Sequence, residues 1–119
     1  MSIAANIIIG LIAALHVYFL VLEMFLWDKP IGLRTFAQTA EQAKITKTLA
    51  ANQGLYNGFL AAGLFWGLWL GDHGGQVKIF FLICVLIAGL YGAATASRKI
   101  LFIQALPAAI GLVLLGLSN

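Results

Sequence analysis

Charged residues are scarce in this sequence, and their scarcity excludes several classes of protein. Only 9% of the 119 residues are charged and 62% are hydrophobic, whereas an ordinary soluble domain has about 25% charged residues. A soluble enzyme, a disordered chain and a nucleic-acid-binding module all need more polar surface than this composition provides. The net charge of +3 comes from only seven basic residues. The single cysteine, Cys84, excludes an internal disulfide and a metal site made of several cysteines.

The apolar residues form four long runs that are separated by the charged residues. The runs cover about residues 3–27, 49–71, 79–97 and 100–117. Each can cross a hydrocarbon core of about 30 Å as a helix that rises about 1.5 Å per residue. The runs do not alternate in polarity as barrel strands would, and a helix pairs its own backbone groups. We therefore predict an all-α fold, a single membrane domain over residues 1–119 built as an up-down-up-down bundle of four transmembrane helices.

The basic residues near the predicted helix ends indicate one orientation in the membrane. Six of them lie in the first and third connections, and only Lys78 lies in the second connection. Because Lys and Arg are enriched on the cytoplasmic side of membrane proteins, both termini are predicted to lie outside the cytoplasm. No Lys or Arg precedes the first run, which is longer than the core of a secretion signal. We therefore expect the first helix to be retained.

The connection over residues 28–48 is too long for a simple link between packed helices. Its apolar residues recur at helical spacing: Leu33, Phe36, Ala37 and Ala40. This spacing predicts a short amphipathic helix on the cytoplasmic lipid head groups, with Pro30 near its start. The alternative is a solvated basic loop. Thr39 and Gln42 match a capping box, which would start the second long helix before Leu49.

Polar side chains inside the apolar runs form the candidate site. A polar group in hydrocarbon is costly unless it is paired, so each one needs a partner or a role. Counting from the predicted helix ends places polar groups of all four helices at a similar depth, in the cytoplasmic half. The candidate ligand-binding residues are Glu23, Asn52, Gln53, Asn57, Tyr91 and Gln104. For the amides and the tyrosine, the alternative role is a hydrogen bond that only holds helices together.

Glu23 and His16 are the candidate residues for acid–base chemistry. They are seven residues apart in the first run, which places them on one helix face. Glu23 has no Lys or Arg in its own run, and as a neutral acid it would donate a hydrogen bond to Asn52 or Gln53. Together the two residues could exchange a proton. Their spacing is too long for two ligands of one ion, so we expect no metal site, and no cofactor is indicated.

Small residues recur every four positions in the second and third runs. Examples are Gly54-x-x-x-Gly58 and Gly63-x-x-x-Gly67. Such rows let two helices approach closely. In a bundle this small, we expect the rows to pack helices within the chain. A homodimer along the second or third helix is the alternative.

Three segments resemble a family of small bacterial integral membrane proteins catalogued as domain of unknown function 1304. They are LEMFLW at residues 22–27, LAANQGLYNGFLAAG at 49–63 and QALPA at 104–108. The resemblance covers nearly the whole chain. It implies four membrane helices in the bacterial plasma (inner) membrane. It supplies no activity and no catalytic residue.

Three functions fit these residues. The first is a membrane protein that binds or transports a small, lipophilic ligand in the cytoplasmic half of the bundle. The second is a membrane enzyme, such as an isomerase, with Glu23 or His16 as general acid–base. The third is a structural subunit without a ligand. The expected partners are membrane lipids, the ligand and a second copy of the chain, but no nucleic acid.

Overall fold

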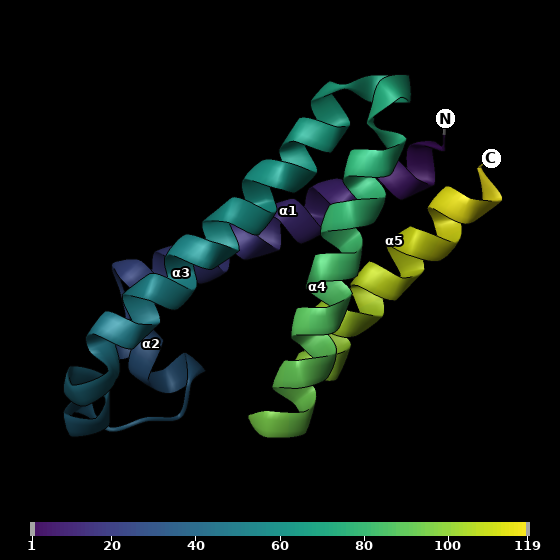
Figure 1. The fold of residues 1–119 in the computed structure, drawn as a ribbon. Coiled ribbons are helices and arrows are strands. Elements are labelled where there is room, and N and C mark those ends of the chain that lie inside the picture. Colours follow the sequence, from purple (N-terminus) through teal and green to yellow (C-terminus); the bar gives the residue numbers. More distant parts are fainter. Residues whose placement is uncertain (1, 119) are drawn as a thin grey trace. The chain divides into compact units, whose positions relative to one another are not determined.

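The computed structural model describes residues 2–118, and every regular element in this range is helical (Figure 1). The elements are α1 (Ile3–Met24), α2 (Pro30–Thr35), α3 (Ala40–Trp69), a 3₁₀ turn η1 (Gly71–Gly74), α4 (Gly75–Thr95), a π-helical turn η2 (Leu101–Ala105) and α5 (Leu106–Leu117). The predicted all-α class is confirmed. The apolar runs give the long helices, because continuous apolar sequence of this length is satisfied by internal backbone pairing.

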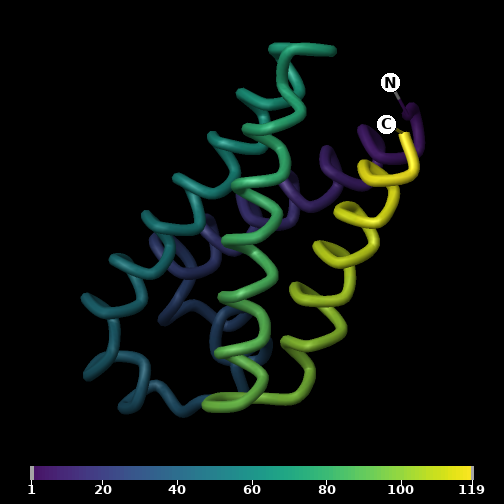
Figure 2. The backbone as a smooth tube through the Cα atoms, turned by 45° about the vertical axis from the view of Figure 1, so that its right-hand side comes forward, coloured from purple at the N-terminus to yellow at the C-terminus, as the bar shows by residue number. Residues whose placement is uncertain are grey.

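The chain forms two compact units, and the two longest helices each contribute to both. Unit 1 comprises Met1–Ala14 and Leu60–Asn119, and unit 2 comprises Leu15–Phe59. Unit 1 therefore contains the first turns of α1, the end of α3, and all of α4 and α5 (Figure 2). Unit 2 contains the end of α1, α2 and the beginning of α3.

Two helical segments within residues 2–118 are long and apolar enough to cross a membrane. They are Ile3–Met24 and Gly71–Thr95, each with a mean hydropathy of 2.3. The sequence predicted four such helices. Helix α3 is long, but the amides of Asn52, Gln53 and Asn57 interrupt its apolar run. The last apolar helix, Leu101–Leu117, is shorter than a typical span.

The connection between α1 and α3 is structured, and its helix is shorter than predicted. Helix α2 begins at Pro30, which suits a first helical position. It ends because Ala37 has a φ of 50°. The amide of Ala37 then donates to the carbonyl of Arg34 at 3.3 Å, and the amide of Gln38 donates to that of Leu33 at 3.0 Å. This pair of bonds is a Schellman motif, which terminates the helix before the predicted stretch to Ala40 is complete.

The capping box at the start of α3 is present as predicted. The Thr39 amide donates to Gln42 Oε1 at 2.9 Å, and the Gln42 amide donates to Thr39 Oγ1 at 3.1 Å. These two bonds satisfy amides that the first helical turn leaves unpaired. Helix α3 consequently begins at Ala40, nine residues before the start of the apolar run at Leu49.

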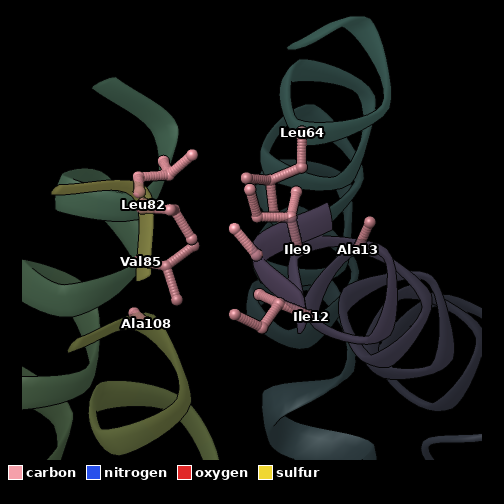
Figure 3. Close-up of a cluster of buried hydrophobic side chains, with 9 residues drawn as sticks. Ile9, Ile12, Ala13, Leu64, Leu82, Val85 and Ala108 are labelled. Atoms are coloured by element: carbon pink, nitrogen blue, oxygen red, sulfur yellow. The ribbon is translucent and has the colours of Figure 1, made fainter. Parts of the chain in front are cut away.

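The core of unit 1 joins four helical segments. Figure 3 shows Ile9 and Ile12 of α1 and Leu64 of α3 on one side, with Leu82 and Val85 of α4 facing them. The buried cluster consists of Ala5, Ile9, Ile12, Ala13, Leu64, Leu82, Val85, Ala108 and Leu115. Both views of the chain place the first turn of α1, the α3–α4 connection and the last turn of α5 at the same end of unit 1 (Figures 1 and 2). The α4–α5 connection lies at the opposite end.

The small-residue rows contact other helices of the same chain. A Cβ atom added to Gly54 would lie 2.7 Å from Met24 Cγ, and one added to Gly58 would lie 2.7 Å from Leu20 Cδ1. In unit 1, a Cβ atom on Gly63 would lie 2.2 Å from the Phe81 ring. These distances are too short for any larger residue without movement. The rows thus pack helices within the chain, which is the use expected for them.

Candidate functional site

Unit 2 joins an acid of α1 to an amide of α3. Glu23 lies in the last turn of α1, and only 9% of its surface is exposed. Its Oε1 accepts a hydrogen bond of 2.5 Å from Asn57 Nδ2. Residues 2–118 contain one ion pair within 4.0 Å, and it does not include Glu23. No basic side chain in this range therefore forms an ion pair with Glu23. The site is therefore an acid held by a neutral amide.

Asn57 can contact Glu23 because it lies on the buried face of α3. Ala43, Ala50 and Gly54 are buried at intervals of seven and four residues, and Asn57 follows three residues later. This spacing places the four residues on one side of a helix. A Cβ atom on Gly54 would lie 3.1 Å from Glu23 Cβ, so glycine lets α3 approach the acid closely.

The predicted partners of Glu23, Asn52 and Gln53, do not pair with it. Both side chains are exposed. At 3.6 residues per turn, Gln53 lies about 100° and Asn52 about 200° round the helix from Gly54. A count of depth places these residues level with Glu23, but it does not give their direction round the helix. The direction of the side chains round α3 selects Asn57 instead.

His16 lies on the same helix as Glu23 and is completely buried. Its ring packs edge-on against Phe19, with the ring centroids 5.5 Å apart. The two residues are seven positions apart, which corresponds to about two turns and about 10 Å along the axis. An imidazole and a carboxyl, both withdrawn from solvent, thus lie along one helix of unit 2. Either group can carry a proton.

The segment that follows Glu23 is fixed against α3. The Trp27 indole N–H donates to Thr46 Oγ1 at 3.1 Å, and the Trp27 ring packs against Phe36 with centroids 4.7 Å apart. Lys47 Nζ lies 3.0 Å from Asp28 Oδ2. This hydrogen bond from the ammonium group lowers the pKa of the Asp28 carboxyl below its ordinary value. These contacts hold the end of α1 beside α3 and so support the geometry around Glu23.

The other two predicted site residues lie in unit 1. The Tyr91 side chain, on α4, is 71% exposed. Gln104 is half-buried in the π-helical turn η2. Of the six predicted residues, Glu23 and Asn57 are the two that form a hydrogen bond with each other.

Sequence reasoning missed a buried lysine in unit 1. The sequence places Lys78 in the second connection, but the residue lies in the first turn of α4 and is completely buried. Its Nζ donates to Asn6 Oδ1 at 3.0 Å and to the Gly71 carbonyl at 3.5 Å. The available signal was Asn6, an amide in the otherwise apolar beginning of the first run. The bond ties the start of α1 to the start of α4.

Metal ligation is not indicated within the part of the chain that the structure describes. No group of three His, Cys, Asp or Glu side chains there could hold a metal ion. The Glu23 site can accept and donate hydrogen bonds and can bind or release a proton. An ionised carboxylate without a basic partner would also attract a cation.

Two comparisons with known proteins identify relatives of the chain. The sequence profile of a family described as "Protein of unknown function (DUF1304)" matches residues 10–116. An "Uncharacterized protein YpaA" of Lactococcus lactis subsp. lactis (strain IL1403) is 29% identical over 102 residues, which cover 83% of this chain and 86% of that protein. No solved structure matches the chain.

Proposed function

The chain belongs to the DUF1304 family of unknown function, and from its own residues we propose that it is a multi-pass membrane protein that binds a small lipophilic ligand at Glu23. The proposal has two parts. The first places the chain in the bacterial plasma membrane, as a bundle of four spans with both termini outside the cytoplasm. The second assigns ligand binding, coupled to a proton, to the acid–amide pair of unit 2.

The exposed surface supports membrane placement. In the two segments that are long and apolar enough to cross a membrane, only 28% and 22% of the most apolar 18 residues are buried, although a core helix of a soluble protein would be mostly buried. On α1 the exposed apolar side chains follow helical spacing: Ile3, Ile7 and Leu11 are 76%, 57% and 62% exposed. A stripe of this kind is costly in water and is compatible with lipid. Trp66 and Trp69 near the end of α3 are typical of a membrane interface.

The single observation that carries the functional proposal is the Glu23–Asn57 hydrogen bond. An ionisable residue inside a membrane helix commonly marks a ligand or proton pathway. Asn57 can bond to the ionised and to the neutral carboxyl, because its amide both donates and accepts. Glu23 can therefore lose its proton and still keep its hydrogen bond to Asn57. A ligand that replaces this proton must carry a positive charge and must reach the acid through an apolar surrounding.

Binding of tetraphenylphosphonium, a lipophilic cation, tests the proposal. Equilibrium dialysis of the purified protein in detergent should show binding that strengthens as the pH rises, because ionised Glu23 attracts the cation. Glu23→Gln should bind weakly at every pH. Gln53→Ala is the matched control, since it removes an exposed amide of α3 and should retain the wild-type profile. Identical profiles for wild type and Glu23→Gln would leave Glu23 as a structural hydrogen-bond partner only.

A further inference from the structure

A groove with a volume of about 270 Å³ lies on the α4–α5 hairpin of unit 1. Helix α4 contributes Leu86 and Leu90, and the segment after the turn contributes Leu101, Phe102, Leu106 and Ala109. All the lining side chains are apolar, so the groove offers no side-chain hydrogen bond to a polar molecule. Its chemistry matches that of a hydrocarbon chain.

The two helices of the hairpin are in close contact beside the groove. A Cβ atom on Gly89 would lie 2.6 Å from the backbone nitrogen of Ala105, so the backbones meet at this level. Ala105 is the last residue of the π-helical turn η2. Such turns are rare in proteins, and many of those that occur lie at functional sites. Leu90 and Phe102 beside this contact remain 50% and 65% exposed. The hairpin thus presents an exposed apolar surface beside the contact between its two helices.

Two cations lie at one end of this groove. Arg98 and Lys99 are exposed in the α4–α5 turn, three and two residues before Leu101, which lines the groove. The Leu101 amide donates to the Arg98 carbonyl at 3.0 Å, which links the turn directly to the lining segment. No Asp or Glu follows Asp72 in the sequence. Asp72 itself precedes α4, about 30 Å along the helix from the turn.

We propose that this hairpin binds one anionic phospholipid, with an acyl chain in the groove and the phosphate at Arg98 and Lys99. A phospholipid combines the two chemistries that the hairpin presents, an apolar chain and a negative charge at its end. The predicted cytoplasmic position of this turn agrees with the anionic leaflet of the membrane. The inference uses the membrane placement proposed above but not the Glu23 site.

Native mass spectrometry of the delipidated protein tests this site. Phosphatidylglycerol and phosphatidylcholine with identical acyl chains are titrated separately, together with inorganic phosphate. The protein should retain one phosphatidylglycerol molecule, bound roughly 30-fold more tightly than phosphatidylcholine at low salt, since each of two cations strengthens binding. Inorganic phosphate should not compete, because it has no chain to fill the groove. Equal affinity for the two lipids, or displacement by phosphate, would overturn the proposal.

Substitutions separate the groove from the charge. Ala109→Phe should fill the groove and weaken phosphatidylglycerol binding about tenfold, whereas Ile110→Phe, on an exposed position outside the lining, should not. The double variant Arg98→Gln/Lys99→Gln should bind both lipids equally. Lys29→Gln/Arg34→Gln removes the same charge from another exposed segment and should preserve the preference.

A further variant guards against misfolding as the explanation. Phe102→Ala deletes a groove wall without adding bulk and should also weaken binding, while circular dichroism reports the helix content. Unchanged binding in both Ala109→Phe and Phe102→Ala would contradict the site. Tetraphenylphosphonium binding should be unchanged in all these variants, so failure of the lipid site can be distinguished from failure of the Glu23 site.

Discussion

At Glu23, one hydrogen bond joins α1 to α3, and two substitutions separate its structural and chemical roles. Glu23→Gln keeps an oxygen that can accept from Asn57 Nδ2, so the thermal midpoint in detergent should change little. Glu23→Ala removes that oxygen and leaves the Asn57 amide unpaired beside Gly54. The free energy of unfolding should fall by about 1–3 kcal/mol. Thermal unfolding followed by circular dichroism measures both changes.

Gln53 provides the control for this comparison, because its exposed side chain makes no hydrogen bond to the residues that the structure describes. Gln53→Ala should alter the free energy of unfolding by no more than about 0.5 kcal/mol. The assigned role of the pair is contradicted if Glu23→Gln is as destabilising as Glu23→Ala.

Asp28 gives a prediction for pH dependence. The pKa of its carboxyl is lowered, first by the hydrogen bond from Lys47 and also by the charge of that ammonium group. A lowered pKa in the folded state means that the pair stabilises the fold above the unfolded-state pKa, and that this contribution is lost as the pH falls through the folded-state pKa. In Lys47→Gln, the Asp28 pKa should return toward its ordinary value. Carbon-detected NMR titration of the carboxyl measures this; an unchanged pKa would show that the pair is absent in solution.

At the residue scale, the sequence identifies the acid but not its partner. Glu23 is conspicuous because it is the one acid inside an apolar run. Its partner depends on side-chain direction round α3, which a count of depth does not determine. Lys78 is harder to find, since a lysine at the start of an apolar run resembles an exposed helix end until Asn6 is brought to it by tertiary packing.

At the scale of elements, Ala37 is a position where a substitution should stabilise the protein. Its φ of 50° lies in the left-handed region, which costs an L-residue with a Cβ atom about 1–2 kcal/mol. Ala37→Gly relieves this strain at the end of α2 and should raise the free energy of unfolding by about 1 kcal/mol. Chemical denaturation in detergent measures the change.

Ala51→Gly is the matched substitution in the interior of α3, where the backbone is helical. There the same change should lower the free energy of unfolding by about 1 kcal/mol. The same sign for the two variants would exclude the Schellman motif as the end of α2.

The helix boundaries show which elements the sequence specifies locally. The capping box at Thr39 and Gln42 needs only neighbouring residues, and it correctly moves the start of α3 ahead of the apolar run. The apolar spacing after Leu33 continues through Ala37, so periodicity alone extends α2 too far. The π-helical turn η2 has no comparable local pattern, and its last residue, Ala105, contacts Gly89 of α4, a residue distant in sequence.

At the scale of the whole molecule, the prediction concerns orientation in the membrane, which contacts between residues do not determine. In a background with Cys84→Ala, a cysteine at Ser2 should react with a membrane-impermeant maleimide in intact cells, because the N-terminus is expected outside. A cysteine at Glu41, an exposed position in the first turn of α3, should react only after permeabilisation. The reverse pattern would show that the orientation is wrong.

The whole-molecule function rests on exchange between a proton and a ligand at Glu23. The most direct measurement is the number of protons released into weakly buffered detergent solution, followed with a pH-indicator dye, as tetraphenylphosphonium saturates the protein. Saturation of the wild-type protein should release a proton for each cation bound, at a pH where Glu23 begins protonated. Glu23→Gln should release none. Saturable cation binding without proton release, or equal release from Glu23→Gln, would contradict proton exchange at this acid.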